Sequence, residues 1–273
     1  MLNMDLKLSQ SDQVAKESRL LMPSKGALKE GYAMHMPSPN TVAPAQGLYQ
    51  PDEFKDNCGF GLIAHMQGDA SHDLVKTAIH SLSCMTHRGG IAADGKTGDG
   101  CGLLLAMPKQ FFREEAKRLS DITLSEVFAV GTIFLSLDPA LAAHAKQTLT
   151  KEIEAEGCKV IAWRVVPTNN DALGSIAMQS LPAFEQVIVN CPIGVTEVEF
   201  NRKLFLARRR AEQQLTADPY FYVTTLCSTV ISYKGLMMPA SIADFYTDLA
   251  DERLASHIVV FHQRFSTNTL PRW

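Results

Sequence analysis

The sequence lacks any apolar run long enough to cross a membrane, because a spanning helix needs about 18 or more such residues in succession. It also lacks an excess of either charge: 26 basic residues (Lys and Arg) stand against 29 acidic ones, for a formal net charge of −3. This balance gives no general attraction to nucleic acid or to an anionic membrane. The amino-terminal segment contains no apolar stretch of the secretory kind. We therefore expect a cytoplasmic protein without a membrane or nucleic-acid partner.

Pairs of the C-x-x-C type, which often mark zinc sites, are missing as well. The six cysteines are scattered along the chain: Cys58, Cys84, Cys101, Cys158, Cys191 and Cys227. Such spacing suits neither a metal site nor a disulfide framework in a chain of 273 residues. Most of these cysteines are expected to be small buried side chains. What the sequence does contain, 46% hydrophobic and 20% charged residues, is typical of a globular protein with a proper core.

Two parts of the chain differ in character. Residues 1–57 carry Pro, Gly, Ser and Asn at short intervals without a sustained period, which indicates a leader or an extended arm. At Cys58 the pattern changes to CGFGLIAHM, an apolar run of strand length. We expect a single domain over residues 58–273. Because its last residues, TNTLPRW, have the character of a loop, the domain is expected to be incomplete at its carboxyl end.

Apolar periodicity predicts a mixed order of helices and strands. Helices are expected from Ser71 to His87, from Asp138 to Gly157, and from the capping box of Thr196 and Glu199 to residue 215. Strands are expected in the segments 58–66, 102–107, 127–136, 159–166, 186–190, 220–232 and 257–265. Because some strands follow one another directly while helices separate others, the order favours a layered α/β or α+β domain.

Two of these helices have a clear apolar face. In the first, the face consists of Leu74, Val75, Ala78, Ile79, Leu82 and Met85. In the second, it consists of Leu141, Ala145, Leu149 and Ile153. Apolar faces with this spacing pack against a sheet or another helix.

The segment GIAADGKT, from Gly90 to Thr97, matches the phosphate-binding pattern G-x-x-x-x-G-K-[ST]. A true phosphate loop follows a strand and begins a helix, so that backbone N–H groups and the helix dipole face the phosphates. Here a helix is expected before the loop and a strand after it, and GDGCG would break a helix beginning at Lys96. We therefore interpret the match as accidental and expect no nucleotide here.

A possible metal site lies on the helix before this loop. His80, Cys84 and His87 are spaced i, i+4 and i+7 and share one helical face, as metal ligands can. That face is opposite the apolar one, and no acidic residue or fourth ligand stands nearby in the sequence. We expect a polar surface rather than a metal ion.

The change of character at Asn57-Cys58 suggests that Cys58 becomes a new amino terminus. An internal cysteine needs a neighbouring base, because a thiol with an ordinary pKa of about 8.5 is only slightly ionised at neutral pH. An amino-terminal cysteine carries its own base, since an α-amine titrates near about 7.7–8.0. Gly59 and Gly61 would let other backbone pass close to this position.

Three motifs occur in a fixed order: NCGFGLIAH, then THRGG with DGKTGDGCG, then HQRFSTNTLPRW. Together they resemble the amino-terminal glutaminase domain of glutamate synthase large subunits. This domain belongs to the class II glutamine amidotransferases and, more widely, to the N-terminal-nucleophile hydrolases. The resemblance covers residues 58–273, with residues 1–57 in the place of a propeptide. It implies an α+β fold, a four-layer αββα sandwich.

The resemblance also implies roles for matching residues. Cys58 corresponds to the nucleophile that attacks the side-chain amide of L-glutamine, forming a γ-glutamyl thioester and releasing ammonia. Arg88 and Arg264 stand where the family places arginines near the bound glutamine, and a guanidinium can bind a carboxylate through two N–H groups. The same pocket would be lined by Phe265, Ser266 and Thr267.

Other parts implied by the resemblance fall outside this sequence. The asparagine–glycine pair of the family's oxyanion hole and the acidic group that binds the glutamine amine would follow Trp273. An oxyanion donor is often worth about 3–4 kcal/mol, so the chain alone is expected to be a weak or inactive glutaminase. In similar proteins a synthase domain of the same polypeptide uses the ammonia to aminate 2-oxoglutarate. FMN, an iron–sulfur cluster and an NADPH-oxidising small subunit belong to that assembly, and no cofactor is expected in this chain.

The segment GIAADGKT is then interpreted as a wall beside the glutaminase site. The nearest alternative is another class II amidotransferase or an N-terminal-cysteine acylase. A more remote one is a nucleotide-binding module that uses Lys96 and Thr97. A third is a non-catalytic remnant of the glutaminase domain.

Overall fold

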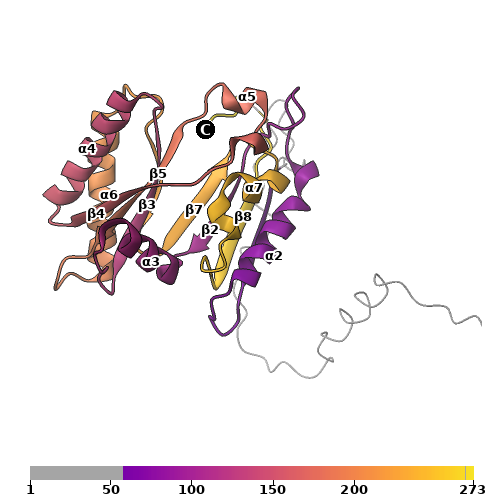
Figure 1. The fold of residues 1–273 in the computed structure, drawn as a ribbon. Coiled ribbons are helices and arrows are strands. Elements are labelled where there is room, and N and C mark those ends of the chain that lie inside the picture. Colours follow the sequence, from indigo (N-terminus) through magenta and orange to yellow (C-terminus); the bar gives the residue numbers. More distant parts are fainter. Residues whose placement is uncertain (1–57, 268) are drawn as a thin grey trace, which may run out of the picture. The chain divides into compact units, whose positions relative to one another are not determined.

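Two four-stranded antiparallel sheets form the centre of the computed structural model, which describes residues 58–267 and 269–273 (Figure 1). The expected leader, residues 1–57, and Asn268 lie outside the described residues. The first sheet has the order β1 (Gly59–Ala64), β8 (Ile258–Gln263), β2 (Cys101–Ala106) and β7 (Val230–Gly235). The second has the order β4 (Lys159–Val165), β5 (Ala183–Asn190), β3 (Phe128–Leu135) and β6 (Tyr222–Cys227).

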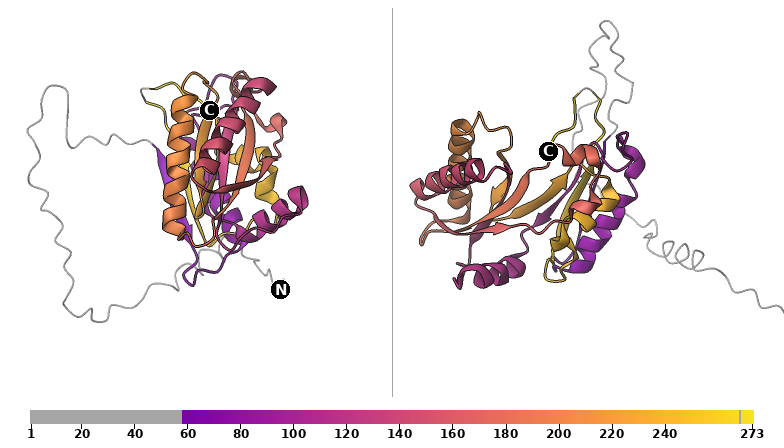
Figure 2. Two further views of the ribbon diagram at one scale, coloured as in Figure 1. Left: turned by 90° about the vertical axis from the view of Figure 1, so that its left-hand side faces the viewer. Right: turned by 45° about the horizontal axis from the view of Figure 1, so that its top comes forward.

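Helices cover the two sheets from opposite sides (Figure 2). The first sheet is flanked by α2 (His72–Ser83), which contacts β8 and β1, and by the short α7 (Ile242–Phe245). The second is flanked by α4 (Pro139–Ala155) and α6 (Glu197–Gln214), which also contact each other. This order of helices, sheet, sheet and helices confirms the expected α+β sandwich. The remaining α-helices of the described part are α3 (Lys109–Ser120) and α5 (Ser175–Met178).

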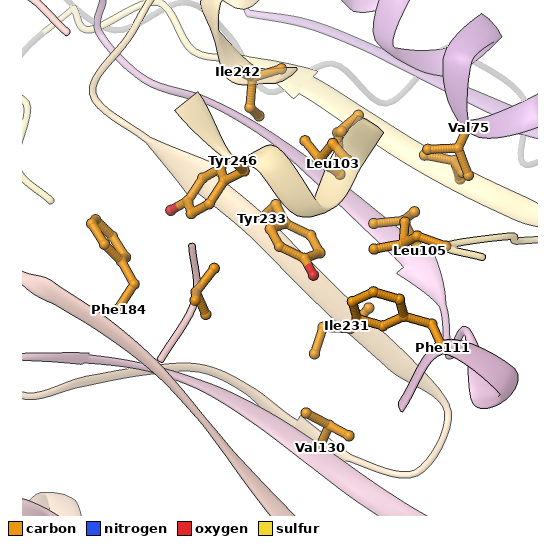
Figure 3. Packing of buried hydrophobic residues seen from close by; sticks show 14 of the residues in the cluster. Val75, Leu103, Leu105, Phe111, Val130, Phe184, Ile231, Tyr233, Ile242 and Tyr246 are labelled. Carbon is orange, nitrogen blue, oxygen red and sulfur yellow. The ribbon is translucent and has the colours of Figure 1, made fainter. Parts of the chain in front are cut away.

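Buried side chains form two clusters, one on each side of the second sheet. Phe128, Val130 and Phe134 of β3 join a cluster that includes the first sheet and α2 (Figure 3). The alternate residues of β3 point the other way and join a cluster with α4 and α6. Every residue of β3 is therefore buried, which is why the strand is apolar throughout except at Thr132.

The helix ends mostly follow their sequence signals. Asp138 accepts hydrogen bonds from the N–H groups of Ala140 and Leu141, and Thr196 accepts one from the N–H of Glu199. Leu141, however, is 46% exposed, and Thr148 takes a place in the buried face of α4. The prediction for Leu141 is wrong: in this first turn of α4 it is Ala142 that packs against the buried cluster.

Three other predictions need correction. The helix expected from Ser71 to His87 ends at Ser83 and is followed by η1, a separate 3-10 turn over Thr86–Arg88. The segment 220–232 is two strands, β6 and β7, which belong to different sheets. The helix α3 was not predicted at all, although its buried residues Phe111, Phe112, Glu115 and Ala116 lie on one face.

None of the helices within residues 58–267 and 269–273 combines the length and the apolar character that crossing a bilayer requires.

Candidate active site

The register of β1 and β8 brings Cys58 to the HQRFST segment. Gly59 pairs with Gln263 across the two strands, so the residue before Gly59 lies beside the residues after Gln263. The backbone N–H of Phe265 donates a hydrogen bond to Cys58 Sγ at 3.3 Å. The carbonyl oxygen of Phe265 lies 3.9 Å from the same sulfur.

Two of the other thiols are buried. Burial raises the pKa of Cys101 to about 12 and that of Cys158 to about 11, so both stay protonated at neutral pH. Cys84 is exposed, and Cys191 and Cys227 are half-buried. The expectation that most cysteines are buried therefore holds only for Cys101 and Cys158 among the five others.

The THRGG segment packs against the residues around Cys58. Glycines in THRGG and in β1 make this close approach possible. A Cβ atom on Gly59 would come within 3.2 Å of Arg88 Cβ, so Gly59 allows the stem of Arg88 to approach. A Cβ atom on Gly89 would lie 2.9 Å from the carbonyl oxygen of Arg264. The three motif segments, far apart in the sequence, thus meet around Cys58.

Arg264 is half-buried, and its guanidinium forms hydrogen bonds with two neighbouring residues. Its Nη1 donates to the carbonyl oxygen of Asp99 at 3.4 Å, and its Nη2 donates to Thr269 Oγ1. The side chain lines a cavity of about 330 Å³. The cavity's other polar lining residues include Asp99, Tyr222, Lys234, His262 and Arg272. Several cationic groups around one small cavity suit a ligand that carries a carboxylate.

The remaining residues of HQRFST have distinct surroundings. Phe265 is 38% exposed, and Thr267 is exposed as well. The N–H of Ser266 donates to Asp99 Oδ2 at 2.6 Å, and its hydroxyl donates to the carbonyl oxygen of Thr269. Ser266 is therefore engaged within the loop, whereas Phe265 and Thr267 are accessible to a ligand.

The GIAADGKT loop binds its own carboxylate. Asp94 Oδ1 accepts the N–H groups of Lys96 at 3.1 Å and Thr97 at 2.8 Å, and Asp94 Oδ2 accepts the N–H of Ile176 at 2.9 Å. The Thr97 hydroxyl adds a bond of 2.7 Å. These bonds, that of Ile176 foremost and then those of Thr97, hold the pKa of Asp94 well below its usual range. The N–H groups that would cradle a phosphate are thus occupied by Asp94.

We therefore expect that ATP with Mg²⁺ leaves the melting temperature of the protein unchanged, in wild type and in Lys96→Ala alike. A ligand that binds only the folded protein stabilises it by an amount that grows with the ratio of its concentration to Kd, so the absence of a shift over the concentrations tested reports the absence of binding there. The measurement is differential scanning fluorimetry over a range of ATP concentrations. A shift in wild type that disappears in Lys96→Ala would establish the nucleotide alternative.

The three residues considered for a metal site are only partly assembled. His80 Nε2 and Cys84 Sγ are 3.9 Å apart, and both residues are exposed. His87 lies in η1, beyond the end of α2. Within the described part of the chain, no group of three or more His, Cys, Asp or Glu side chains is placed to hold a metal ion.

Comparison with known proteins shows the family of this chain. A family model described as "Glutamine amidotransferases class-II" matches residues 58–273, beginning at Cys58 itself. The chain belongs to this family. The fold of two antiparallel sheets between helices is that of a class II amidotransferase, as the sequence resemblance implied.

Similar amidotransferase regions occur in several glutamate synthases. The chain is 39% identical over 236 residues to the glutamate synthase (NADPH) large chain of Bacillus subtilis (strain 168), covering 86% of this chain and 16% of that protein. It is 37% identical over 238 residues to ferredoxin-dependent glutamate synthase 2 of Synechocystis sp., covering 86% and 15%. With glutamate synthase (NADH) of Saccharomyces cerevisiae the identity is 35% over 254 residues, covering 88% and 12%. The chain thus spans less than a fifth of these relatives.

Sequence reasoning missed two carboxylates, of which Asp99 contacts the HQRFST segment. Asp94 and Asp99 both lie in the glycine-rich segment, and both accept backbone N–H groups. The only signal was an aspartate next to glycines. That pattern also occurs in ordinary turns.

Proposed function

We propose that the chain is the glutamine-hydrolysing part of a glutamate synthase, with Cys58 as its nucleophile. The observation that carries this proposal is the hydrogen bond from the Phe265 N–H to Cys58 Sγ. This bond connects Cys58, the first residue of the family match, to the HQRFST segment. The THRGG segment packs beside both. Cys58 is the cysteine that these three segments surround.

In the proposed reaction, the thiol proton of Cys58 passes to a base, and the sulfur attacks the side-chain amide carbon of glutamine. A tetrahedral intermediate forms and then collapses as the C–N bond breaks. Ammonia leaves with the proton that the base returns, and a γ-glutamyl thioester remains. Water, losing a proton to the same base, attacks the thioester carbon, and glutamate leaves as the thiolate is released.

The base in this proposal is the α-amine of Cys58 itself, freed by removal of residues 1–57. A free α-amine titrates near about 7.7–8.0, so a useful fraction is unprotonated at neutral pH. A peptide nitrogen has no such basicity. Removal of residues 1–57, the proposed propeptide, would therefore activate the nucleophile.

Binding of the substrate is assigned to the residues around Cys58. The guanidinium groups of Arg264 and Arg88 would hold the α-carboxylate of glutamine, because a guanidinium stays charged and offers paired N–H groups. Arg264 lines the cationic cavity, whose lining includes neither Cys58 nor Arg88. Support for Arg264 comes from its place next to Phe265, the residue that contacts Cys58 Sγ. The exposed Phe265 and Thr267, with the backbone of Ser266, would form the rest of the pocket.

The ammonia released here would serve a synthase domain of the same polypeptide, which aminates 2-oxoglutarate to glutamate. FMN and an iron–sulfur cluster would supply the redox chemistry of that domain. The described residues do not fit such a cluster, because cluster ligands are grouped cysteines and the six cysteines here are dispersed over the fold. The relatives use NADPH, NADH or ferredoxin by name. An NADPH-oxidising small subunit is the partner we propose.

The mature protein is expected to begin at Cys58. Intact-mass measurement and amino-terminal sequencing of the full-length protein, purified from its own cells, check this directly. A protein that retains residues 1–57 and still hydrolyses glutamine at full rate would overturn the amine-assisted mechanism.

The nearest alternatives, another amidotransferase or an N-terminal-cysteine acylase, are separated by the fate of the ammonia. A glutamate synthase forms two glutamates from glutamine and 2-oxoglutarate when a reductant is present. Glutamine hydrolysis that neither depends on 2-oxoglutarate nor consumes a reductant would favour the alternatives.

A further inference from the structure

The carboxylate of Asp99 joins two of the three motif segments. Its Oδ2 accepts the backbone N–H of Ser266 in HQRFST at 2.6 Å. The same oxygen accepts the backbone N–H of Gly90 in THRGG at 3.1 Å. A Cβ atom on Gly90 would lie 2.6 Å from this oxygen, so a glycine is required for the approach. Hydrogen bonds to an ionised acceptor are about twice as strong as neutral ones.

The main chain around Asp99 reinforces this connection. The N–H of Asp99 donates to the carbonyl oxygen of Gly90 at 3.2 Å. The N–H of Arg264 donates to the carbonyl oxygen of Gly100 at 2.9 Å. The carbonyl oxygen of Asp99 accepts Nη1 of Arg264 at 3.4 Å. The backbone of Asp99 thus holds the guanidinium of Arg264. The side chain of Asp99 holds the loop that contains Ser266.

Between the two anchored residues stands Phe265. Arg264 is tied to Asp99 and Gly100, and Ser266 is tied to the Asp99 carboxylate, so the peptide between them has little freedom to turn. The N–H of Phe265 is the group that contacts Cys58 Sγ, at 3.3 Å. The Asp99 carboxylate therefore fixes the direction of that N–H without touching the sulfur.

We propose that Asp99 is a positioning residue of the glutaminase reaction, whose carboxylate holds the Phe265 N–H against the nucleophilic sulfur of Cys58. The inference rests on the proposed function, because it assigns Asp99 to the reaction of Cys58. Asp99 would act on the backbone N–H groups of Gly90 and Ser266 and not on the substrate.

Removing the carboxylate should affect turnover rather than binding. In Asp99→Ala the loop that carries Phe265 loses its anchor, while the backbone carbonyl that holds Arg264 remains. A small misplacement near the reacting atoms can cost about 10²-fold in rate. We expect kcat for glutamine hydrolysis to fall by about this factor, with KM for glutamine within a few-fold of wild type.

Asp99→Asn is the conservative variant, since its amide oxygen can accept the same two N–H groups without charge. Neutral hydrogen bonds are weaker, so we expect a fall in kcat of less than about tenfold. Asp94→Ala is the matched control. Asp94 is a carboxylate of the same glycine-rich segment that accepts N–H groups of Thr97 and Ile176 and none from HQRFST. It should lower thermal stability while kcat stays within a few-fold of wild type.

The test compares kcat, KM and melting temperature of these three variants in the full-length protein, with intact mass to verify the same amino terminus. The order wild type, Asp99→Asn, Asp99→Ala in kcat, with KM unchanged and Asp94→Ala active, supports the positioning role. Wild-type kcat in Asp99→Ala overturns it, as does an equal loss in Asp94→Ala. Where Asp99→Ala does not fold, Asp99→Asn decides: a lower kcat at unchanged KM supports the role, and wild-type kcat overturns it.

Failure of the proposed function has a different signature. It appears in the wild-type protein, as absence of glutamine hydrolysis or as hydrolysis that survives replacement of Cys58. Normal hydrolysis through Cys58 together with a fully active Asp99→Ala variant would remove the role of Asp99 alone.

Discussion

Replacement of Cys58 by serine in the full-length protein is expected to lower the rate of glutamine hydrolysis by about 10⁴-fold or more, the range found when an enzyme loses its nucleophile. The loss is large because serine keeps the shape of the side chain but ionises far less readily than cysteine at neutral pH. The Phe265 N–H, placed to bind a sulfur at 3.3 Å, cannot compensate for this difference. Release of ammonia from glutamine, measured at saturating substrate, checks the result.

The matched control is Cys84→Ser. Cys84 is an exposed thiol with an imidazole nitrogen of His80 at 3.9 Å, so it has both an accessible sulfur and a neighbouring base. It lies beyond the end of α2, and none of its hydrogen bonds reaches the HQRFST segment. Activity within a few-fold of wild type is expected. An active Cys58→Ser protein combined with an inactive Cys84→Ser protein would move the nucleophile to Cys84.

The sequence predicted the individual strands well and their partners hardly at all. Largely apolar runs such as FAVGTIFL identify buried strands, because both faces of β3 are covered. Nothing in the segments 58–66 and 257–265 says that they pair, since the contact spans nearly the whole domain. The β6–β7 turn was missed for a related reason. Ser228 and Thr229 are ordinary turn residues inside a long apolar segment, and the change of sheet there depends on tertiary packing.

The candidate site shows the same division. Cys58, Arg88 and Arg264 are the residues to which the family resemblance assigns roles, and those roles stay predictions. Asp99 was not predicted, because it acts on backbone N–H groups, and those contacts exist only once Gly90 and Ser266 have been brought together. Asp94 similarly binds Ile176, which lies in another part of the chain. A carboxylate that organises loops has no local sequence signature.

The second large effect is expected at a buried ion-pair cluster around Arg164, whose side chain is 5% exposed. Its guanidinium donates to Asp248 with Nη1 at 2.7 Å and Nη2 at 2.6 Å. Its Nε donates to Glu115 at 3.0 Å, and its Nη1 also donates to Gln186 at 3.0 Å. The Tyr233 hydroxyl donates to Asp248 at 3.1 Å. The cluster thus connects α3 and both sheets.

The charges in this cluster depend on one another. Burial alone would lower the pKa of Arg164, but the hydrogen bonds and charge of Asp248 outweigh it and raise this pKa above its usual range. Burial, and secondly the charge of Asp248, raise the pKa of Tyr233, so its hydroxyl remains a donor. Removal of one member would leave the others buried without their partner.

Asp248→Ala is therefore expected to lower the free energy of unfolding by about 3–5 kcal/mol, the cost of breaking a buried ion pair on one side. For a domain of this size the melting temperature would fall by roughly 10 °C. The control is Arg253→Ala. Arg253 contacts Glu114, Glu115 and Asp251 from the surface, where its side chain is 40% exposed, so its loss should cost less than about 1 kcal/mol. Urea denaturation of both variants measures the difference.

The same physics predicts that the double variant Arg164→Met with Asp248→Ala is more stable than the sum of the two single losses implies. Each single substitution leaves a charge buried without its partner, whereas the double one removes both charges that face each other at 2.6 Å. Glu115 limits the recovery, because it would keep only Arg118 and Arg253 as partners, both nearer the surface. A coupling energy of about 0.5–3 kcal/mol between the two substitutions is expected, while strict additivity would mean that Arg164 and Asp248 stabilise the fold independently.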